Sequence, residues 1–180
     1  GLGNFKNWNV SCIPTSTEKF ILSIVNTMEI QLKFIDSYQF LYNSLSKAVN
    51  SLTDTPRTKT EMTNDKLCKS KGIFPYEFAT SLIVLTKTLE LLPIWEGVTE
   101  SEYMLAKDIW KEMGCHSMLD YMLVYMKLDV FLLADVFQQF RQKSIQNNGL
   151  EPLNFYGIPG MSWGSALMTL DEPITLLKDL

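Results

Sequence analysis

The sequence is poor in the residues that build disulfide frameworks, metal clusters and membrane spans. Its 180 residues include three cysteines and one histidine. The cysteines, Cys12, Cys68 and Cys115, are far apart and form no C-x-x-C pair, which argues against a disulfide-rich domain or a zinc knuckle and favours a reducing, intracellular compartment. The longest apolar run is about six residues, whereas a membrane-spanning helix needs about 20. We therefore expect no membrane partner.

Positive charge is also scarce. The formal net charge of −4 disfavours a generic basic nucleic-acid clamp. The acidic excess lies in residues 90–112, where six acidic residues stand against two lysines, whereas residues 54–71 carry five basic and three acidic residues. We interpret the acidic run as the solvated face of a helix.

Apolar material for a core is plentiful, because 46% of the residues are hydrophobic and 12% are aromatic. The length corresponds to about one domain, since domains usually have ~100–200 residues. This composition excludes a disordered or collagen-like chain. The chain begins with Gly1-Leu2-Gly3 and has no signal-peptide pattern, so we expect a segment of a longer protein.

Two segments near the N-terminus predict strands. Residues 18–25 and 32–35 are rich in β-branched and aromatic side chains, with a candidate turn at 26–27. A polar stretch without periodicity, residues 53–66, is typical of a loop, and residues 151–164, with three glycines and two prolines, of a linker.

Helix signals follow. Ser44 is a suitable cap for a helix that ends at Leu52, and Thr99 or Ser101 for one that ends near Met113. Shorter elements are expected around these two: an irregular crossing over 71–75, a short helical stretch from Tyr76, and the start of a helix over 163–170.

The longest periodic segment runs from Ser117 to about Asn147 and ends near Gly149. Its apolar residues recur at steps of three and four, which is the signature of an amphipathic helix. We expect this stripe to face the core; it consists of Leu119, Met122, Leu123, Met126, Val130, Leu133, Phe137 and Phe140.

The most informative polar pair, Tyr125 and Asp129, lies on this helix. Residues four apart lie within about 40° of each other, so both polar groups share one strip beside the apolar stripe. A carboxylate there can bind a hard divalent cation such as magnesium or manganese, while the phenol orients a water. The alternative is an interfacial tyrosine beside a solvated aspartate.

Two further candidates come from loops. Lys71 precedes Gly72 in the basic stretch and can meet a phosphate as a point charge, although an ordinary exposed lysine explains it as well. Asp36-Ser37-Tyr38 follows the second predicted strand, where a hydroxyl and an aromatic ring can hold a single strand by hydrogen bonding and stacking. Its alternative is a turn that caps the strand.

Other catalytic motifs are missing from the sequence. No G-x-x-x-x-G-K, G-x-G-x-x-G or H-E-x-x-H occurs. Residues 160–164 have the letters of G-x-S-x-G, but they lie in the proline-rich linker, without a histidine placed to serve them. We expect the single histidine, His116, to cap or pack at a helix start.

Taken together, four runs resemble protein-primed family-B DNA polymerases, the type found in phages, adenoviruses, linear plasmids and Maverick/Polinton transposons, and most of all the transposon and linear-plasmid branch. The runs are LKFIDSYQFLYNSLSKAV (32–49), KGIFPYEF (71–78), LDYMLVYMKLDVFLLADVFQQFR (119–141) and FYGIPGMSWGSALM (155–168).

The resemblance implies roles for individual residues. Tyr125 and Asp129 match the third exonuclease motif, Y-x-x-x-D, and Lys71 and Phe74 match the K-x-x-hydrophobic motif. The single-strand-binding motif, (S/T)-L-x-x-hydrophobic, matches Ser37, Tyr38 (in place of leucine) and Leu41. Ser44, Leu45 and Ala48 also fit its letters.

The family's mechanism is two-metal 3′–5′ proofreading with Mg²⁺ or Mn²⁺. The resemblance implies that Asp129 is a metal ligand, that Tyr125 orients the attacking water, and that Lys71 offsets charge on the scissile phosphate or holds the carboxylates in place. Ser37 and Tyr38 would hold the frayed 3′ end of the single-stranded primer. A terminal priming protein is a further implied partner.

The first two exonuclease motifs and the polymerase motifs are not found in the sequence, so we expect the fragment alone to be inactive. The expected fold is α/β: a partial, helix-rich ribonuclease-H-like exonuclease fold with a truncated sheet, in which the long helix covers one face of the strands. Residues 1–150 would form the C-terminal half of the exonuclease domain, and residues 151–180 the linker and the start of the palm. The alternative function is a non-catalytic helical module for DNA positioning or protein interaction.

Overall fold

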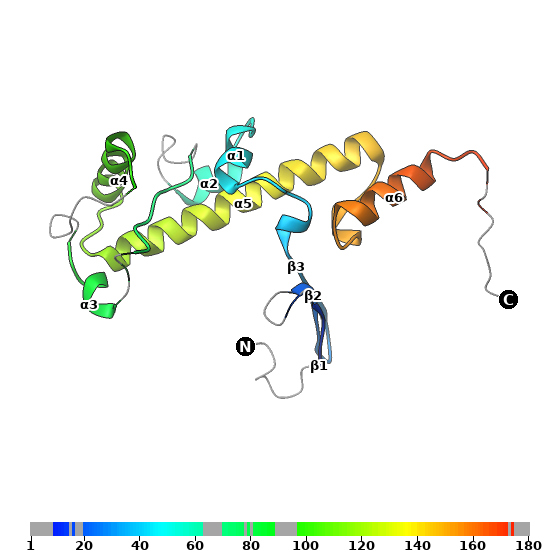
Figure 1. The fold of residues 1–180 in the computed structure, drawn as a ribbon, viewed down its shortest axis with the longest axis horizontal. Coiled ribbons are helices and arrows are strands. Elements are labelled where there is room, and N and C mark those ends of the chain that lie inside the picture. The colour runs from blue at the N-terminus through cyan, green and yellow to red at the C-terminus, as the bar shows by residue number, and fades with distance from the viewer. Residues whose placement is uncertain are drawn as a thin grey trace. The chain divides into compact units, whose positions relative to one another are not determined.

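A computed structural model describes residues 9–14, 16, 20–62, 70–77, 79, 81–88, 97–172 and 174. The chain forms two compact units, Gly1–Asn43 with Phe140–Leu180 and Ser44–Gln139, and Figure 1 labels their elements. None of the described helices combines the length and the apolar character needed to cross a bilayer.

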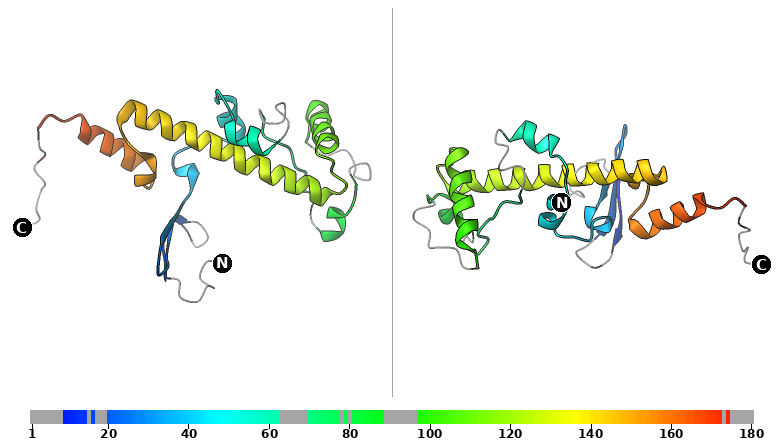
Figure 2. Two further views of the ribbon diagram at one scale, coloured as in Figure 1. Left: turned by 180° about the vertical axis from the view of Figure 1, so that it is seen from behind. Right: turned by 90° about the horizontal axis from the view of Figure 1, so that it is seen from above.

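The first unit contains a three-stranded antiparallel sheet in the order β1-β2-β3, whose strands are the blue arrows in Figure 2. Its strands are β1 (Asn9–Pro14), β2 (Phe20–Asn26) and β3 (Gln31–Ile35). The two strands expected from the sequence are confirmed, and β1 is an addition. The turn between β2 and β3 lies later than expected, because the hydroxyl of Thr27 accepts from the amides of Glu29 and Ile30.

Two helical segments complete this unit. The 3-10 helix η5 (Pro152–Asn154) and helix α6 (Ile158–Met168) occupy the stretch expected to be a linker, and α6 begins earlier than the helix start expected over 163–170. The role of this stretch as a linker between domains stays a prediction. Proline suits the first turn of a helix, where its missing N–H is not needed, and α6 has a proline there. Arg141 anchors the stretch by a two-point ion pair with Glu151, at 2.9 and 2.7 Å.

The second unit begins with two short helices, α1 (Leu45–Asn50) and α2 (Pro56–Glu61). The first is confirmed, with Ser44 as its cap. The second contradicts the expected loop at residues 56–61, and residues 63–66 of that loop lie outside the described residues. Its N-cap residue, Thr55, makes no capping side-chain hydrogen bond. The carboxylate of Asp135, on the long helix α5 (Met118–Asn148), accepts from the first amides of α2 instead.

Helix α4 (Glu100–Glu112) follows Thr99, one of the two predicted caps, and Thr99 and Glu102 form a capping box in which each side chain accepts from the other residue's backbone amide. Gly114 follows it with φ 62°. The acidic side chains of α4 are exposed, which confirms the solvated face for the described part of residues 90–112. Helix α3 (Leu82–Leu85) lies later than the helical stretch expected from Tyr76, which instead forms a turn.

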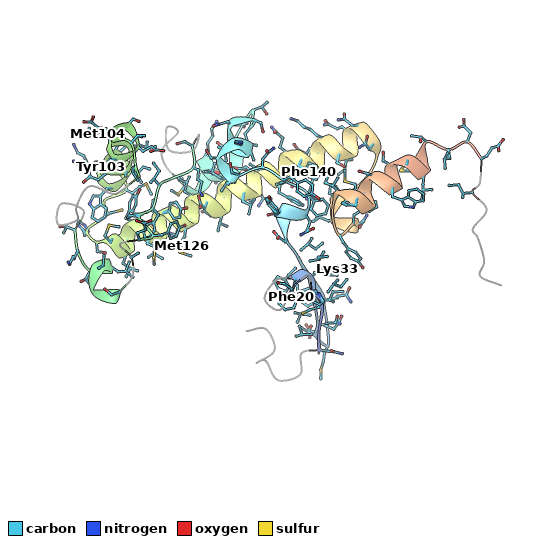
Figure 3. All side chains as sticks on the ribbon, viewed as in Figure 1. Phe20, Lys33, Tyr103, Met104, Met126 and Phe140 are labelled. Carbon is cyan, nitrogen blue, oxygen red and sulfur yellow. The ribbon has the colours of Figure 1, made fainter. Side chains whose placement is uncertain are left out.

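Helix α5 (Met118–Asn148) is the predicted long helix, but the wrong face was assigned to the core. Five residues of the expected stripe are 36–62% exposed: Leu119, Leu123, Met126 (labelled in Figure 3), Val130 and Leu133. The buried residues form the neighbouring stripe of Met118, Tyr121, Tyr125, Leu128, Leu132 and Val136. Both stripes have helical spacing, so periodicity alone cannot choose between them.

The architecture is therefore α/β, with one small antiparallel sheet and several helices. The ribonuclease-H-like topology, the packing of the long helix on the strands and the domain boundary at residue 150 stay predictions.

Candidate functional site

The candidate site is centred on one turn of α5 that carries Tyr125 and Asp129. Tyr125 is 5% exposed, and Asp129 is half-buried. The K-G-I-F segment crosses this turn directly. A β-carbon at Gly72 would lie 3.1 Å from Cδ2 of Tyr125, so a larger residue there would require the ring of Tyr125 to shift by a few tenths of an ångström. The ring of Phe74 lies 5.4 Å from that of Tyr125.

Hydrogen bonds hold the crossing segment on the helix. The hydroxyl of Tyr121 donates to the carbonyl oxygen of Ile73 at 2.7 Å, and the hydroxyl of Tyr76 donates to that of Tyr125 at 3.0 Å. Tyr76 was not among the residues expected at the site. No periodic signal marks it; only its position two residues after Phe74 could have suggested it.

Tyr125 remains a neutral phenol under ordinary conditions. Burial raises its pKa well above the usual range, and the hydrogen bond with Tyr76 and the nearby carboxylate of Asp129 raise it further. A neutral phenol can donate and accept hydrogen bonds but cannot act as a strong base. The chemistry available to Tyr125 is therefore the orientation of a neighbouring group.

Asp129 carries the clearest sign of a missing partner. Its Oδ1 atom is buried and, among the residues that the structure describes, has no hydrogen-bond partner. Buried carboxylate oxygens are normally satisfied, and exceptions call for an explanation such as a bound ion or a water. A carboxylate oxygen such as that of Asp129 is a suitable ligand for a hard divalent cation. No group of three or more candidate ligating side chains occurs in the described ranges, so Asp129 would need carboxylates from elsewhere.

The structure brings the segment of Lys71 to the Tyr125 side of α5. Lys71 is half-buried, and a β-carbon at its neighbour Gly72 would meet the side chains of Tyr125 and Leu128. Within the described residues Lys71 and Asp129 do not form an ion pair. The role of Lys71 toward a phosphate stays a prediction.

The candidate single-strand motif lies in the first unit and follows β3. Ser37 and Tyr38 form the 3-10 helix η2 (Ser37–Gln39), and the carboxylate of Asp36 accepts from the amide of Tyr38 at 3.0 Å. The cap expected after the strand is thus present, yet Tyr38 remains 57% exposed. Leu41 is half-buried.

The alternative match for this motif lies at the start of α1. The hydroxyl of Ser44 accepts from the amide of Lys47 at 3.4 Å, so it already serves as a helix cap. Leu45 and Ala48 are half-buried on the same helix. The contacts of both matches with DNA stay predictions.

One buried carboxylate was missed altogether. Asp135 is 3% exposed and accepts from the amides of Arg57 and Thr58, at 3.1 and 3.0 Å, and from the hydroxyl of Thr58 at 2.7 Å. These bonds occupy both of its oxygens and cap α2, so its role is structural. Its place inside an apolar run, V-F-L-L-A-D-V-F, was the available signal.

Comparison with known proteins gives one match. A family model described as DNA polymerase type B, organellar and viral, matches residues 4–162, which is most of the chain. No curated protein and no solved structure gives a significant match.

Proposed function

Because the chain belongs to the organellar and viral type B DNA polymerases, we propose that it supplies the third exonuclease motif of a 3′–5′ proofreading domain. In this proposal residues 1–150 form the C-terminal half of that domain, and residues 151–180 lead into the polymerase palm. The family implies DNA as the partner. The observation that supports the finer assignment is the buried Oδ1 atom of Asp129, which has no hydrogen-bond partner among the described residues and lies on the same helix face as the neutral phenol of Tyr125.

The residues present would share the work as follows. Asp129 offers one carboxylate oxygen to a divalent cation. Such a cation, when bound, lowers the pKa of its water and stabilises the leaving oxygen. Tyr125 orients the water through its hydroxyl, which Tyr76 holds in place by a hydrogen bond. Lys71, on the crossing segment, offsets charge on the scissile phosphate.

We expect no nuclease activity from these 180 residues alone, since one carboxylate cannot hold two metals. The exposed apolar stripe on α5, from Leu119 to Leu133, supports this, because contiguous apolar faces usually pack against another surface. A labelled single-stranded oligonucleotide with Mg²⁺ or Mn²⁺ should stay intact. Metal-dependent degradation that Asp129→Ala abolishes would contradict the expectation.

The location of the DNA end can be tested without activity. A single-stranded oligonucleotide with 4-thiothymidine at its 3′ end should photo-crosslink to peptides of residues 70–77 or 121–129. The matched control carries the same base at the 5′ end and should not label these peptides. Crosslinks of the 3′ end confined to other segments would overturn the exonuclease assignment.

The exposed apolar stripe on α5 also favours a second candidate function, a non-catalytic module that positions DNA or binds a protein. Val130 is 62% exposed and directly follows Asp129, so a partner could cover this face. In that case Val130→Asp should abolish partner binding, while Asp129→Asn should leave the crosslinks of both DNA ends unchanged. Loss of only the 3′-end crosslinks on Asp129→Asn would favour the exonuclease site.

A further inference from the structure

We propose that Tyr42 joins Tyr38, for which the resemblance already implies single-strand binding, in a stacking platform for one unpaired DNA base. This inference rests on the proposed function, because it names how the same domain holds a single strand. Tyr42 lies outside every motif matched above, and the structure alone pairs it with Tyr38.

The two rings form an open corner. Their centroids are 5.9 Å apart and their planes meet at 79°, so the edge of one ring meets the face of the other. Tyr38 is 57% exposed and Tyr42 is 59% exposed. A flat base that stacks on one ring can therefore also contact the second ring.

The segment that carries the platform is anchored from within its own unit. Phe40, midway between the two tyrosines, is 4% exposed, and its ring lies 6.0 Å from that of Phe140 (labelled in Figure 3). A β-carbon at Gly157 would lie 3.0 Å from the carbonyl oxygen of Gln39, so the backbones approach closely there. A fixed segment loses little conformational freedom when a ligand binds.

The chemistry of the platform selects unpaired strands. Every base has a π-face, so stacking on tyrosine tolerates any sequence. In a duplex those faces are covered by neighbouring base pairs, whereas a frayed primer end exposes them at little cost. Two exposed aromatic rings therefore fit a sequence-tolerant grip.

The test measures affinity for a labelled 12-nucleotide single strand by fluorescence anisotropy at fixed salt. Tyr42→Ala should weaken binding by about 5- to 150-fold, from the usual effect of removing one stacked ring, whereas Tyr42→Phe should retain it. Trp163→Ala, which removes another exposed aromatic ring (64% exposed), is the matched control and should have no effect. A blunt duplex should bind equally to all four proteins.

Unchanged affinity of Tyr42→Ala, or no single-strand binding by the unaltered chain, would overturn the platform. Either result would leave the 3′-end crosslinks to residues 70–77 and 121–129 as a separate measure of the exonuclease assignment. Conversely, the unaltered chain could show no 3′-end crosslinks to residues 70–77 or 121–129 while its affinity for the single strand falls on Tyr42→Ala. That result would overturn the exonuclease assignment and support the platform. Circular dichroism of each variant confirms that an effect on binding is not unfolding.

Discussion

Replacement of Asp135 by alanine should destabilise the second unit substantially. The carboxylate accepts three hydrogen bonds from the first turn of α2, two of them from Thr58, which is fully buried. After Asp135→Ala the amide and the hydroxyl of Thr58 would be buried without a partner. The amide of Arg57 lies at a partly buried edge that water can reach.

The magnitude follows from these groups. Each buried polar group left unsatisfied costs about 1–3 kcal/mol, so the two groups of Thr58 predict a loss of about 2–6 kcal/mol. Removal of the buried charge itself recovers part of this cost, since desolvation of a carboxylate is expensive. We therefore expect a loss near the lower half of the range, about 2–4 kcal/mol, against a usual total stability of about 5–15 kcal/mol.

Urea unfolding followed by circular dichroism would measure the loss, and hydrogen exchange of residues 56–62 would show whether α2 opens first. Asp108→Ala, an exposed acid on α4, is the control and should change stability by less than about 0.5 kcal/mol. Thr58→Ala combined with Asp135→Ala should be less than additive, because the two side chains share one hydrogen bond. A loss below about 1 kcal/mol with unchanged exchange in α2 would refute the reasoning.

Three further predictions concern other positions. Gly72→Ala places a β-carbon 3.1 Å from the ring of Tyr125 and should destabilise the second unit by about 1–3 kcal/mol through overpacking. The effect should appear as a lower urea midpoint and as a change in near-ultraviolet circular dichroism. An unchanged spectrum and midpoint would contradict the close packing. Hydrogen bonds from the backbone of His116 and from Ser117 lower the pKa of Asp120. The contribution of this carboxylate to folding stability is therefore complete above its unfolded pKa of about 3.9 and is lost as the pH falls through the lower folded value. Asp120→Asn should flatten the acid limb of a stability–pH profile, and an unchanged limb would argue against this cap. Gly157→Ala should push against the carbonyl oxygen of Gln39 and weaken single-strand binding as strongly as the loss of one stacked ring; full affinity would show that the platform does not depend on this anchor.

The sequence by itself determined the elements whose signals are local. The capping box of Thr99 and Glu102 and the left-handed glycines Gly114 and Gly149 place the ends of two helices correctly, because their hydrogen bonds and backbone angles involve only a few neighbouring residues. The strands near residues 20–35 follow from their β-branched and aromatic content. The candidate pair on α5 was equally readable, since its members are four residues apart.

Tertiary structure alone decided which apolar stripe of α5 is buried, where α2 forms and what surrounds Tyr125. Each depends on contacts between residues far apart in the chain, such as Thr58 with Asp135, 77 positions away, and Tyr76 with Tyr125, 49 positions away. Periodicity reports that a face is apolar but not which partner covers it. Short polar segments such as residues 56–61 become helical only when a distant side chain satisfies their free amides.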